Sequence, residues 1–163
     1  MRWSKQAVSV DLALYQPDIA ANTGTLLRLG ACLGVPVHLI HPAGFAVTQR
    51  NLARSGMDYL ERANLVEHAS FSAFEAWRGS VGRRLVLLTT RSAHSAYDAA
   101  YVSGDILMLG RESAGVPDDV AAIADLRVRI PMAPGLRSIN VAIAGSMVLG
   151  EAMRQTGRFT ELS

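Results

Sequence analysis

The chain has 163 residues, 50% of them hydrophobic, and a formal net charge of only +2 at pH 7. This length fits one domain with a substantial core, and the composition excludes an intrinsically disordered chain. No apolar stretch approaches the roughly 20 residues that a membrane-spanning helix needs, and the first residues lack the pattern of a signal peptide. The single cysteine, Cys32, excludes an internal disulfide. We therefore expect a globular protein of the cytoplasm.

In chain order, the pattern predicts a strand over 8–14, a helix over 22–34, a strand over 35–41, a short helix over 48–56 and a strand over 64–69. It then predicts a helix over 70–80, strands over 83–90 and 105–110, a helix over 117–125, a strand over 126–130 and a last helix over 138–155. Asn22 or Thr23 is expected to cap the first helix, and Gly56 to end the second.

Apolar strands that alternate with helices predict an α/β fold, in which helices cover both faces of a mostly parallel sheet. The sequence has no linker, repeat or low-complexity segment, so residues 1–163 are expected to form a single domain. The basic residues are fifteen arginines and one lysine. This bias suits phosphate binding, but the codon usage of a GC-rich genome explains it at least as well, because the arginines form no run.

Three loops that follow predicted strands are rich in glycine, serine, proline or charge: "TTRSAHS", "GRESAGVP" and "PMAPGLRSIN". In open parallel sheets, ligands bind beyond the carboxyl ends of the strands. Three such loops in succession indicate a binding site at this edge of the sheet.

The common catalytic signatures are missing from the sequence, which has no GxxxxGK[ST] loop, no HExxH and no CxxC pair. His38 and His41 lie three apart on a predicted strand and therefore on opposite faces, which argues against a shared metal. We expect structural or surface roles for these two histidines and for His68 and His94, and no metal site. The sequence also lacks a nucleophile elbow, so it does not indicate a serine hydrolase.

Polar residues gather in three motifs. "NTGTLLR" contributes Asn22, Gly24 and Arg28; "GRESAGVP" contributes Gly110, Glu112 and Gly115; the last loop contributes Arg137, Ser138 and Asn140. Each residue alone has a structural explanation. Asn22 and Ser138 suit helix caps, Gly110 suits a turn, Glu112 suits a solvated loop, and Arg28 suits an exposed helix face.

Taken together, "NTGTLLR", "LMLGRESAGVP" and "IPMAPGLRSIN" resemble the motifs of the SPOUT-class (SpoU/TrmH-like) RNA 2′-O-methyltransferases, over about Val10 to Gly157. The chain is most similar to the compact TrmL or YibK-like group, which lacks an added RNA-binding domain and methylates the wobble ribose of tRNA. Two positions depart from the family pattern. Arg111 stands where relatives often have proline, and Ala142 stands where many have a hydroxyl.

The resemblance implies a deep trefoil knot in the C-terminal part, with the knot and cofactor loops over about 83–157. It also implies S-adenosyl-L-methionine as the cofactor, and a homodimer whose active sites use both subunits. By position, it implies cofactor contacts at Leu88, Gly110, Ile130 and Ser138. The implied side-chain chemistry involves Arg28, Glu112, Arg137, Ser138 and Asn140, and the implied RNA contacts are Asn22, Arg28 and Arg137.

The leading hypothesis is a tRNA 2′-O-methyltransferase that acts on the wobble nucleotide, cytidine or uridine 34. Arg28 is expected to clamp a phosphate rather than to act as a base, because guanidinium does not readily lose a proton. The alternatives are the same reaction on rRNA or another tRNA position, an RNA-binding protein without catalysis, and an α/β nucleotide-binding enzyme unrelated to methylation.

The predicted last helix is apolar on nearly every side over 141–153. Val141, Gly145, Leu149 and Ala152 are expected to cover the sheet. Ala142, Ser146 and Gly150 form a stripe of small residues spaced four apart, which predicts a homodimer packed through this helix. The alternative is that the stripe packs under another helix of the same chain.

Overall fold

The computed structural model describes residues 8–52 and 61–163, and its centre is a six-stranded sheet in the order β3-β2-β1-β5-β4-β6. The strands are β1 (Asp11–Tyr15), β2 (Val37–Ile40), β3 (Leu65–His68), β4 (Leu85–Leu88), β5 (Ile106–Leu109) and β6 (Leu126–Val128). All strand pairings within this sheet are parallel. Each predicted strand is present, but shorter than its apolar run.

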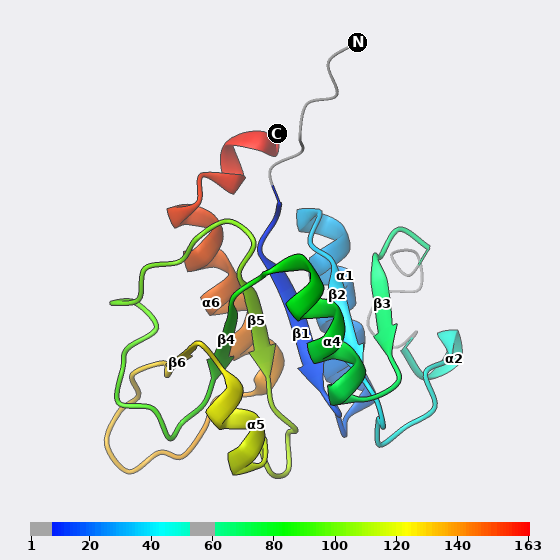
Figure 1. Ribbon diagram of the computed structural model, residues 1–163, viewed down its shortest axis with the longest axis horizontal. Helices are drawn as coiled ribbons and strands as arrows, with labels where there is room; N and C mark the ends of the chain where they lie inside the picture. Colours follow the sequence, from blue (N-terminus) through cyan, green and yellow to red (C-terminus); the bar gives the residue numbers. More distant parts are fainter. Residues whose placement is uncertain (1–7, 53–60) are drawn as a thin grey trace.

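Helices cover both faces of the sheet, as predicted (Figure 1). One face carries α1 (Ala20–Leu33) and α6 (Val141–Gln155), and the other carries α4 (Phe71–Val81) and α5 (Asp118–Ile123). The short α2 (Gln49–Leu52) corresponds to the start of the helix predicted over 48–56, whose remainder, including Gly56, lies outside the described residues. A 3-10 helix, η2 (Arg158–Glu161), follows α6.

The alternation of side chains along each strand builds two cores. On β1, Leu12 and Leu14 join the core under α1 and α6, whereas Ala13 and Tyr15 join the core under α4 and α5. The helix α6 lies close to the sheet at Gly145, where a Cβ atom would come within 2.7 Å of Leu109 Cδ1. A glycine at this position therefore lets α6 approach β5.

Two predicted helix starts are wrong by a few residues. The first helix, α1, begins at Ala20 after an extended Ile19, whose side chain makes no capping hydrogen bond. Asn22 and Thr23 consequently lie inside the first turn and do not cap it. The difference matters for the site, because an Asn22 side chain that does not cap the helix is available for other partners.

The last helix, α6, begins at Val141 instead of Ser138. Its N-cap is Asn140, whose Oδ1 accepts hydrogen bonds from the backbone N–H groups of Ala142 (2.8 Å) and Ile143 (3.3 Å). Residues 131–140 therefore remain a loop, and Ser138 lies in this loop two residues before the cap.

The exposed side of α6 differs from the predicted stripe of small residues. Ala142 is only 5% exposed and packs within the chain's own core, so it cannot belong to an outer stripe. The exposed apolar residues are instead Ile143 (54%) and Met147 (38%), one turn apart, with Ser146 and Gly150 partly exposed nearby.

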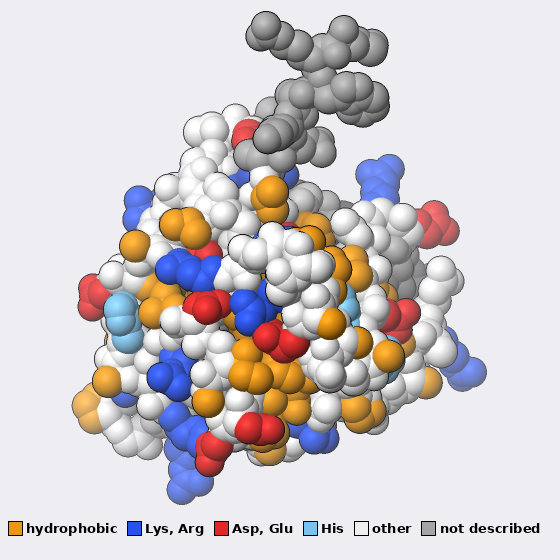
Figure 2. Space-filling view, viewed as in Figure 1, with side chains coloured by type: hydrophobic (Ala, Val, Ile, Leu, Met, Phe, Trp, Pro, Cys, Tyr) orange, Lys and Arg blue, Asp and Glu red, His pale blue; other side chains and the backbone are white. Residues whose placement is uncertain are grey.

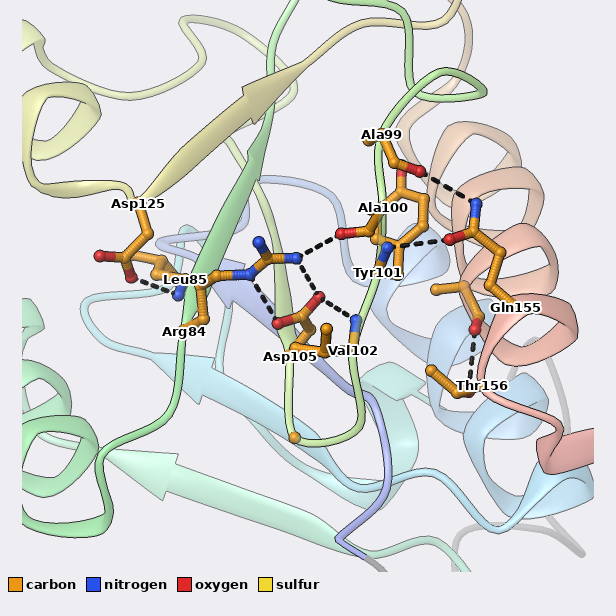
Figure 3. Close-up of polar contacts among 12 residues, drawn as sticks. Arg84, Leu85, Ala99, Ala100, Tyr101, Val102, Asp105, Asp125, Gln155 and Thr156 are labelled. Atoms are coloured by element: carbon orange, nitrogen blue, oxygen red, sulfur yellow. Dashed lines mark hydrogen bonds and ion pairs between the residues drawn. The ribbon is translucent and has the colours of Figure 1, made fainter.

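The long segment between β4 and β5 is attached to the end of α6 (Figure 3). The Gln155 side chain accepts a hydrogen bond from the Tyr101 backbone N–H at 2.9 Å and donates one to the Ala99 carbonyl at 3.0 Å. Nearby, Arg84 forms two hydrogen bonds with the fully buried Asp105, at 2.9 and 2.7 Å. These contacts lie at the amino ends of β4 and β5 and fix the base of the loop.

Two histidines form a buried hydrogen-bonded chain under α4. His38 Nε2 lies 2.9 Å from Asp11 Oδ2, and His38 Nδ1 lies 2.9 Å from His68 Nε2. Arg83 donates to the same Asp11 oxygen at 2.8 Å, and Trp77 covers both histidine rings. The expected structural role therefore fits His38 and His68.

The surface over α4 and α5 carries basic and acidic side chains that are interspersed with apolar ones (Figure 2). Within the described ranges, no helix is long and apolar enough to cross a membrane. The same residues contain no cluster of three or more histidine, cysteine or acidic side chains placed to hold a metal ion.

Candidate active site at the carboxyl ends of the strands

The connections of the sheet change direction between β1 and β5, which are neighbours in the strand order. After β1 the chain passes through α1 to β2 on one side, and after β5 it passes through α5 to β6 on the other. Ligands of open α/β sheets bind where such connections diverge, beyond the carboxyl ends of the strands. The motif residues that follow β1 and β5 therefore lie at the same edge of the sheet.

A cavity of about 760 Å³ lies at this edge of the sheet. It is lined by Ile19 and Asn22, and by residues from the ends of three strands onward: 87–91 of β4, 109–118 of β5, and 128–130 with Met132 of β6. Residues 138–141 and Ala144, around the start of α6, complete the lining. All three loops selected from the sequence contribute to the lining. Its volume is typical of a small-molecule site.

The structure brings most of the predicted site residues together. The four predicted cofactor residues, Leu88, Gly110, Ile130 and Ser138, all line the cavity, and so do Asn22, Glu112 and Asn140. Arg28 and Arg137 are exposed and lie outside the lining. The predicted residues thus divide into a group within the cavity and two arginines outside it.

The turn after β5 depends on two glycines. Arg111 and Gly115 pair across this turn, each donating its backbone N–H to the other's carbonyl at 2.9 Å. A Cβ atom on Gly110 would lie 2.7 Å from Gly115 Cα, and Gly115 itself has a φ of +63°. Only glycine fits both positions without displacement of the backbone, which explains their spacing in "GRESAG".

Glu112, Asn22 and Asn140 form a chain of side-chain hydrogen bonds across the three motifs. Glu112 Oε1 accepts from Asn22 Nδ2 at 3.4 Å, and Asn22 Oδ1 accepts from Asn140 Nδ2 at 3.2 Å. Glu112 Oε2 accepts from the Asp18 backbone N–H at 2.7 Å. These hydrogen bonds link α1, the turn after β5 and the cap of α6 along the wall of the cavity.

The sequence alone did not single out the lining residues Thr89, Thr90 and Arg91, although they lie in the selected loop "TTRSAHS". Arg91 joins this loop to the start of α5. Its guanidinium donates to Asp118 Oδ1 at 2.8 Å and to the Val116 carbonyl at 3.1 Å. The position of Arg91 just after a predicted strand is the sequence signal that could have identified it as a site residue. Its partners could not be predicted, because they lie 27 and 25 residues away in the chain.

Comparisons with known proteins find close relatives of this chain. A curated tRNA (cytidine(34)-2'-O)-methyltransferase of Ancylobacter novellus is 57% identical over 93% of this chain and 96% of its own length. A solved structure described as giving structural insights into the 2-OH methylation of C/U34 on tRNA is 39% identical, with a TM-score of 0.86 over 91% of this chain and 97% of that one.

An AdoMet-bound rRNA methyltransferase from Sinorhizobium meliloti shares the fold at 25% identity, with a TM-score of 0.84 over 93% of this chain and 58% of that one. The SpoU rRNA methylase family matches residues 9–150, which include all three motifs and the cavity. The chain therefore belongs to the SpoU rRNA methylase family.

Proposed function

We propose that this protein transfers a methyl group from S-adenosyl-L-methionine to the ribose 2′-hydroxyl of the wobble nucleotide, cytidine or uridine 34, of tRNA. The observation that carries the proposal is the cavity to which all three motifs contribute. The wobble position is supported by the relative that is 57% identical and by the structure concerned with C/U34 of tRNA.

The cavity fits the proposed cofactor in size and chemistry. Its volume of about 760 Å³ suits a nucleoside with an amino-acid tail. The lining combines apolar groups such as Leu88 and Ile130 with the hydroxyl of Ser138, and Glu112 adds a carboxylate that suits a cationic ligand. Gly110 lines it without a side chain, so the backbone directly after β5 stays accessible.

S-adenosyl-L-methionine, when bound, supplies an electrophilic methyl group on a positively charged sulfur. Leu88, Gly110, Ile130 and Ser138 would hold it, with Leu88 and Ile130 contributing mainly backbone groups. The protein's own task is to orient the ribose and to attract the proton of its hydroxyl. Positioning of this kind supplies on the order of 7–11 kcal/mol in favourable cases.

The two arginines outside the cavity suit the RNA. Arg28 is exposed on α1, and Arg137 is exposed in the loop before α6. Guanidinium groups bind phosphate through paired hydrogen bonds, so these residues would hold the RNA backbone while the ribose reaches the cavity. Ser138 and Asn140 line the cavity and would contact the hydroxyl or the cofactor. Asn22 is held by Glu112 and Asn140 and would support this arrangement.

The test is methylation of defined tRNA by the purified protein with S-adenosyl-L-methionine, followed by mass spectrometry of the nucleosides. The expected product is 2′-O-methylcytidine or 2′-O-methyluridine at the wobble position. A matched tRNA with a 2′-deoxy nucleotide at that position lacks the nucleophile and must stay unmethylated. Methylation of rRNA in place of tRNA, or methylation of the 2′-deoxy tRNA, would contradict the proposal.

We also propose a homodimer packed through α6. Ile143 and Met147 give this helix an exposed apolar strip, and the small Ser146 and Gly150 beside it allow close approach of a second helix. Ile143→Asp would place a charge in such an interface, so sedimentation should show a folded monomer. Ile123→Asp, at an isoleucine that is 44% exposed on α5, is the control and should leave the dimer intact. A dimeric Ile143→Asp protein would exclude this face.

The family membership further supports a C-terminal trefoil knot, which we propose for the region of about 83–157. The contacts of Gln155 with Ala99 and Tyr101 suit such a knot, since they hold α6 against the long loop between β4 and β5. We propose a single domain over 1–163 that acts in the cytoplasm, where tRNA is modified.

A further inference from the structure

Asp18 contacts three consecutive residues of the turn that follows β5. Its Oδ1 accepts hydrogen bonds from Arg111, at 3.1 Å from Nη2 and 3.3 Å from Nε. Its Oδ2 accepts from the backbone N–H of Ser113 at 3.1 Å and from the Ser113 hydroxyl. Its own backbone N–H donates to Glu112 Oε2 at 2.7 Å. Asp18, in the segment that follows β1, thus holds a turn that lies 93 to 95 positions later in the chain.

The Asp18 carboxylate is charged at neutral pH. Hydrogen bonds from Ser113, and then the hydrogen bond and charge of Arg111, hold the pKa of Asp18 below its ordinary value of 3.8. The Asp18 side chain is 21% exposed and that of Arg111 is 39% exposed, so solvent screens their attraction. What this contact supplies is the geometry of the turn.

The backbone that leads to Asp18 is held in an unusual conformation. Gln16 has a φ of +42°, in the left-handed region that residues with a side chain seldom adopt. Its N–H donates to the Ile40 carbonyl at 2.9 Å, and the carbonyl of the next residue, Pro17, accepts from Gly44 at 2.8 Å. Such strain persists only where the surrounding structure fixes it, and it is found preferentially at functional sites.

We propose that Asp18 is a positioning residue for the methyl transfer, and that it acts by holding the turn after β5 so that Glu112 meets the Asn22 amide. The proposal rests on the function proposed above. Glu112 presents one oxygen to the Asp18 N–H and the other to Asn22 Nδ2. A shift of the turn would break the second contact, which is the longer of the two at 3.4 Å, and would release Asn22 from its fixed orientation toward Asn140.

The carboxylate is required because every side-chain contact of Asp18 described above is with a donor. Both of its oxygens accept, one from Arg111 and one from Ser113. Asparagine has the same size but turns an N–H₂ group toward one of these donors. Asp18→Asn is therefore the sharpest variant, since it removes one acceptor and leaves the backbone N–H that faces Glu112.

The experiment compares wild type, Asp18→Asn, Glu112→Gln and the double variant in the tRNA methylation assay. It measures kcat, KM for tRNA, the melting temperature, and the dissociation constant of S-adenosyl-L-methionine by calorimetry. The control is Asp98→Asn, at an exposed carboxylate outside the cavity, which should behave as wild type. Asp18→Asn should lower kcat about tenfold or more, because small misplacements near the reacting groups have effects of this size.

A double-mutant cycle separates positioning from general stabilisation. If Asp18 acts through Glu112, Asp18→Asn should lower kcat by less than about twofold in the Glu112→Gln background. Additive losses in the cycle, or an unchanged kcat in Asp18→Asn, would overturn the proposal. Absence of turnover in the wild type on any RNA would instead overturn the proposed function, and the positioning role with it.

A milder variant keeps the test decisive if Asp18→Asn does not fold. Ser113→Ala removes only the hydroxyl contact with Asp18 and keeps the backbone contact. It should lower kcat by a smaller factor than Asp18→Asn does. This loss should also disappear in the Glu112→Gln background. A loss that persists in that background would overturn the proposal.

Discussion

Asn140 donates a hydrogen bond from its side-chain amide to Asn22 Oδ1 over 3.2 Å, although the two residues lie 118 positions apart in the chain. The oxygen of the same Asn140 amide accepts from the backbone N–H groups of Ala142 and Ile143 in the first turn of α6. These two sets of partners fix the orientation of the amide, because only its nitrogen can donate and only its oxygen can accept here. One side chain therefore both caps α6 and joins it to α1.

The first prediction separates these two tasks of Asn140. Asn140→Asp keeps an oxygen for the helix cap but loses the donor to Asn22. The melting temperature should stay close to that of wild type, because aspartate is as good an N-cap as asparagine, while kcat for tRNA methylation should fall about tenfold or more. Thermal unfolding measures the first effect, and steady-state kinetics with tRNA at saturating S-adenosyl-L-methionine measures the second.

Asn140→Ala is the comparison, since it removes both tasks. It should lower the free energy of unfolding by about 1 kcal/mol through the lost cap, in addition to the loss of turnover. If Asn140→Asp is as unstable as Asn140→Ala, or if it retains full turnover, the link to Asn22 is not what the reaction needs.

The second prediction concerns the close approach of Gly110 and Gly115. Gly110→Ala would place a Cβ atom 2.7 Å from Gly115 Cα, where only backbone atoms are available to move. The free energy of unfolding should fall by about 1–3 kcal/mol, the usual range for overpacking. Binding of S-adenosyl-L-methionine should weaken as well, because the displaced turn lines the cavity. Denaturant unfolding and calorimetry test both effects.

Gly79→Ala is the matched control for this substitution. Gly79 lies in α4, and a Cβ atom added there would meet nothing within 4 Å beyond the backbone of its own helix. Alanine there should raise the free energy of unfolding by about 0.5–1 kcal/mol, because it removes the flexibility of a glycine within a helix. If both variants are equally stable, the close approach at Gly110 carries no stability cost.

Much of this fold could be predicted from local patterns. Each strand is a run of apolar residues, and apolar residues recur at helical spacing in the helices. The rule that ligands bind at strand ends also selected the three loops that line the cavity. The register between distant segments could not be predicted. Nothing near Asn22 in the sequence indicates that its partners are Glu112 and Asn140, 90 and 118 residues away.

The exposed side of α6 was misjudged for a related reason. A helix that is apolar all round gives no periodic signal to distinguish its inner and outer sides. The pattern predicts an outer stripe that includes Ala142, but Ala142 is buried in the core of the chain. Ile143 and Met147 are exposed instead.

The third prediction tests the role of Arg28. Arg28→Ala should lower the rate of methyl transfer by at least about a hundredfold, the scale of removing one well-placed electrostatic group. The affinity for S-adenosyl-L-methionine should hardly change, because Arg28 lies outside the cavity. Arg28→Lys keeps the charge and should recover part of the rate, as a phosphate clamp would allow. Loss of cofactor binding with normal turnover at saturation would show that Arg28 belongs to the cofactor site.

The fourth prediction is a pH dependence of stability that comes from the buried His68. Burial, and then the neighbouring His38, hold the pKa of His68 below its ordinary value of 6.5. The unfolded chain therefore binds more protons than the folded one as the pH falls through 6.5, and the folded state loses stability in this range. The free energy of unfolding should be lower at about pH 5.5 than at about pH 7.5, as measured by denaturant titration.

The nearby carboxylate of Asp11 leaves this expectation intact. Burial raises the pKa of Asp11, but hydrogen bonds from His38 and Arg83 outweigh it and keep the pKa below 3.8, so Asp11 stays ionised throughout this window. His68→Gln retains an N–H donor for His38 and removes the titration, so the difference between the two pH values should shrink. His94→Gln, at an exposed histidine, should keep the wild-type difference. If the free energy of unfolding of His68→Gln keeps the wild-type pH dependence, that dependence comes from another group and the prediction is wrong.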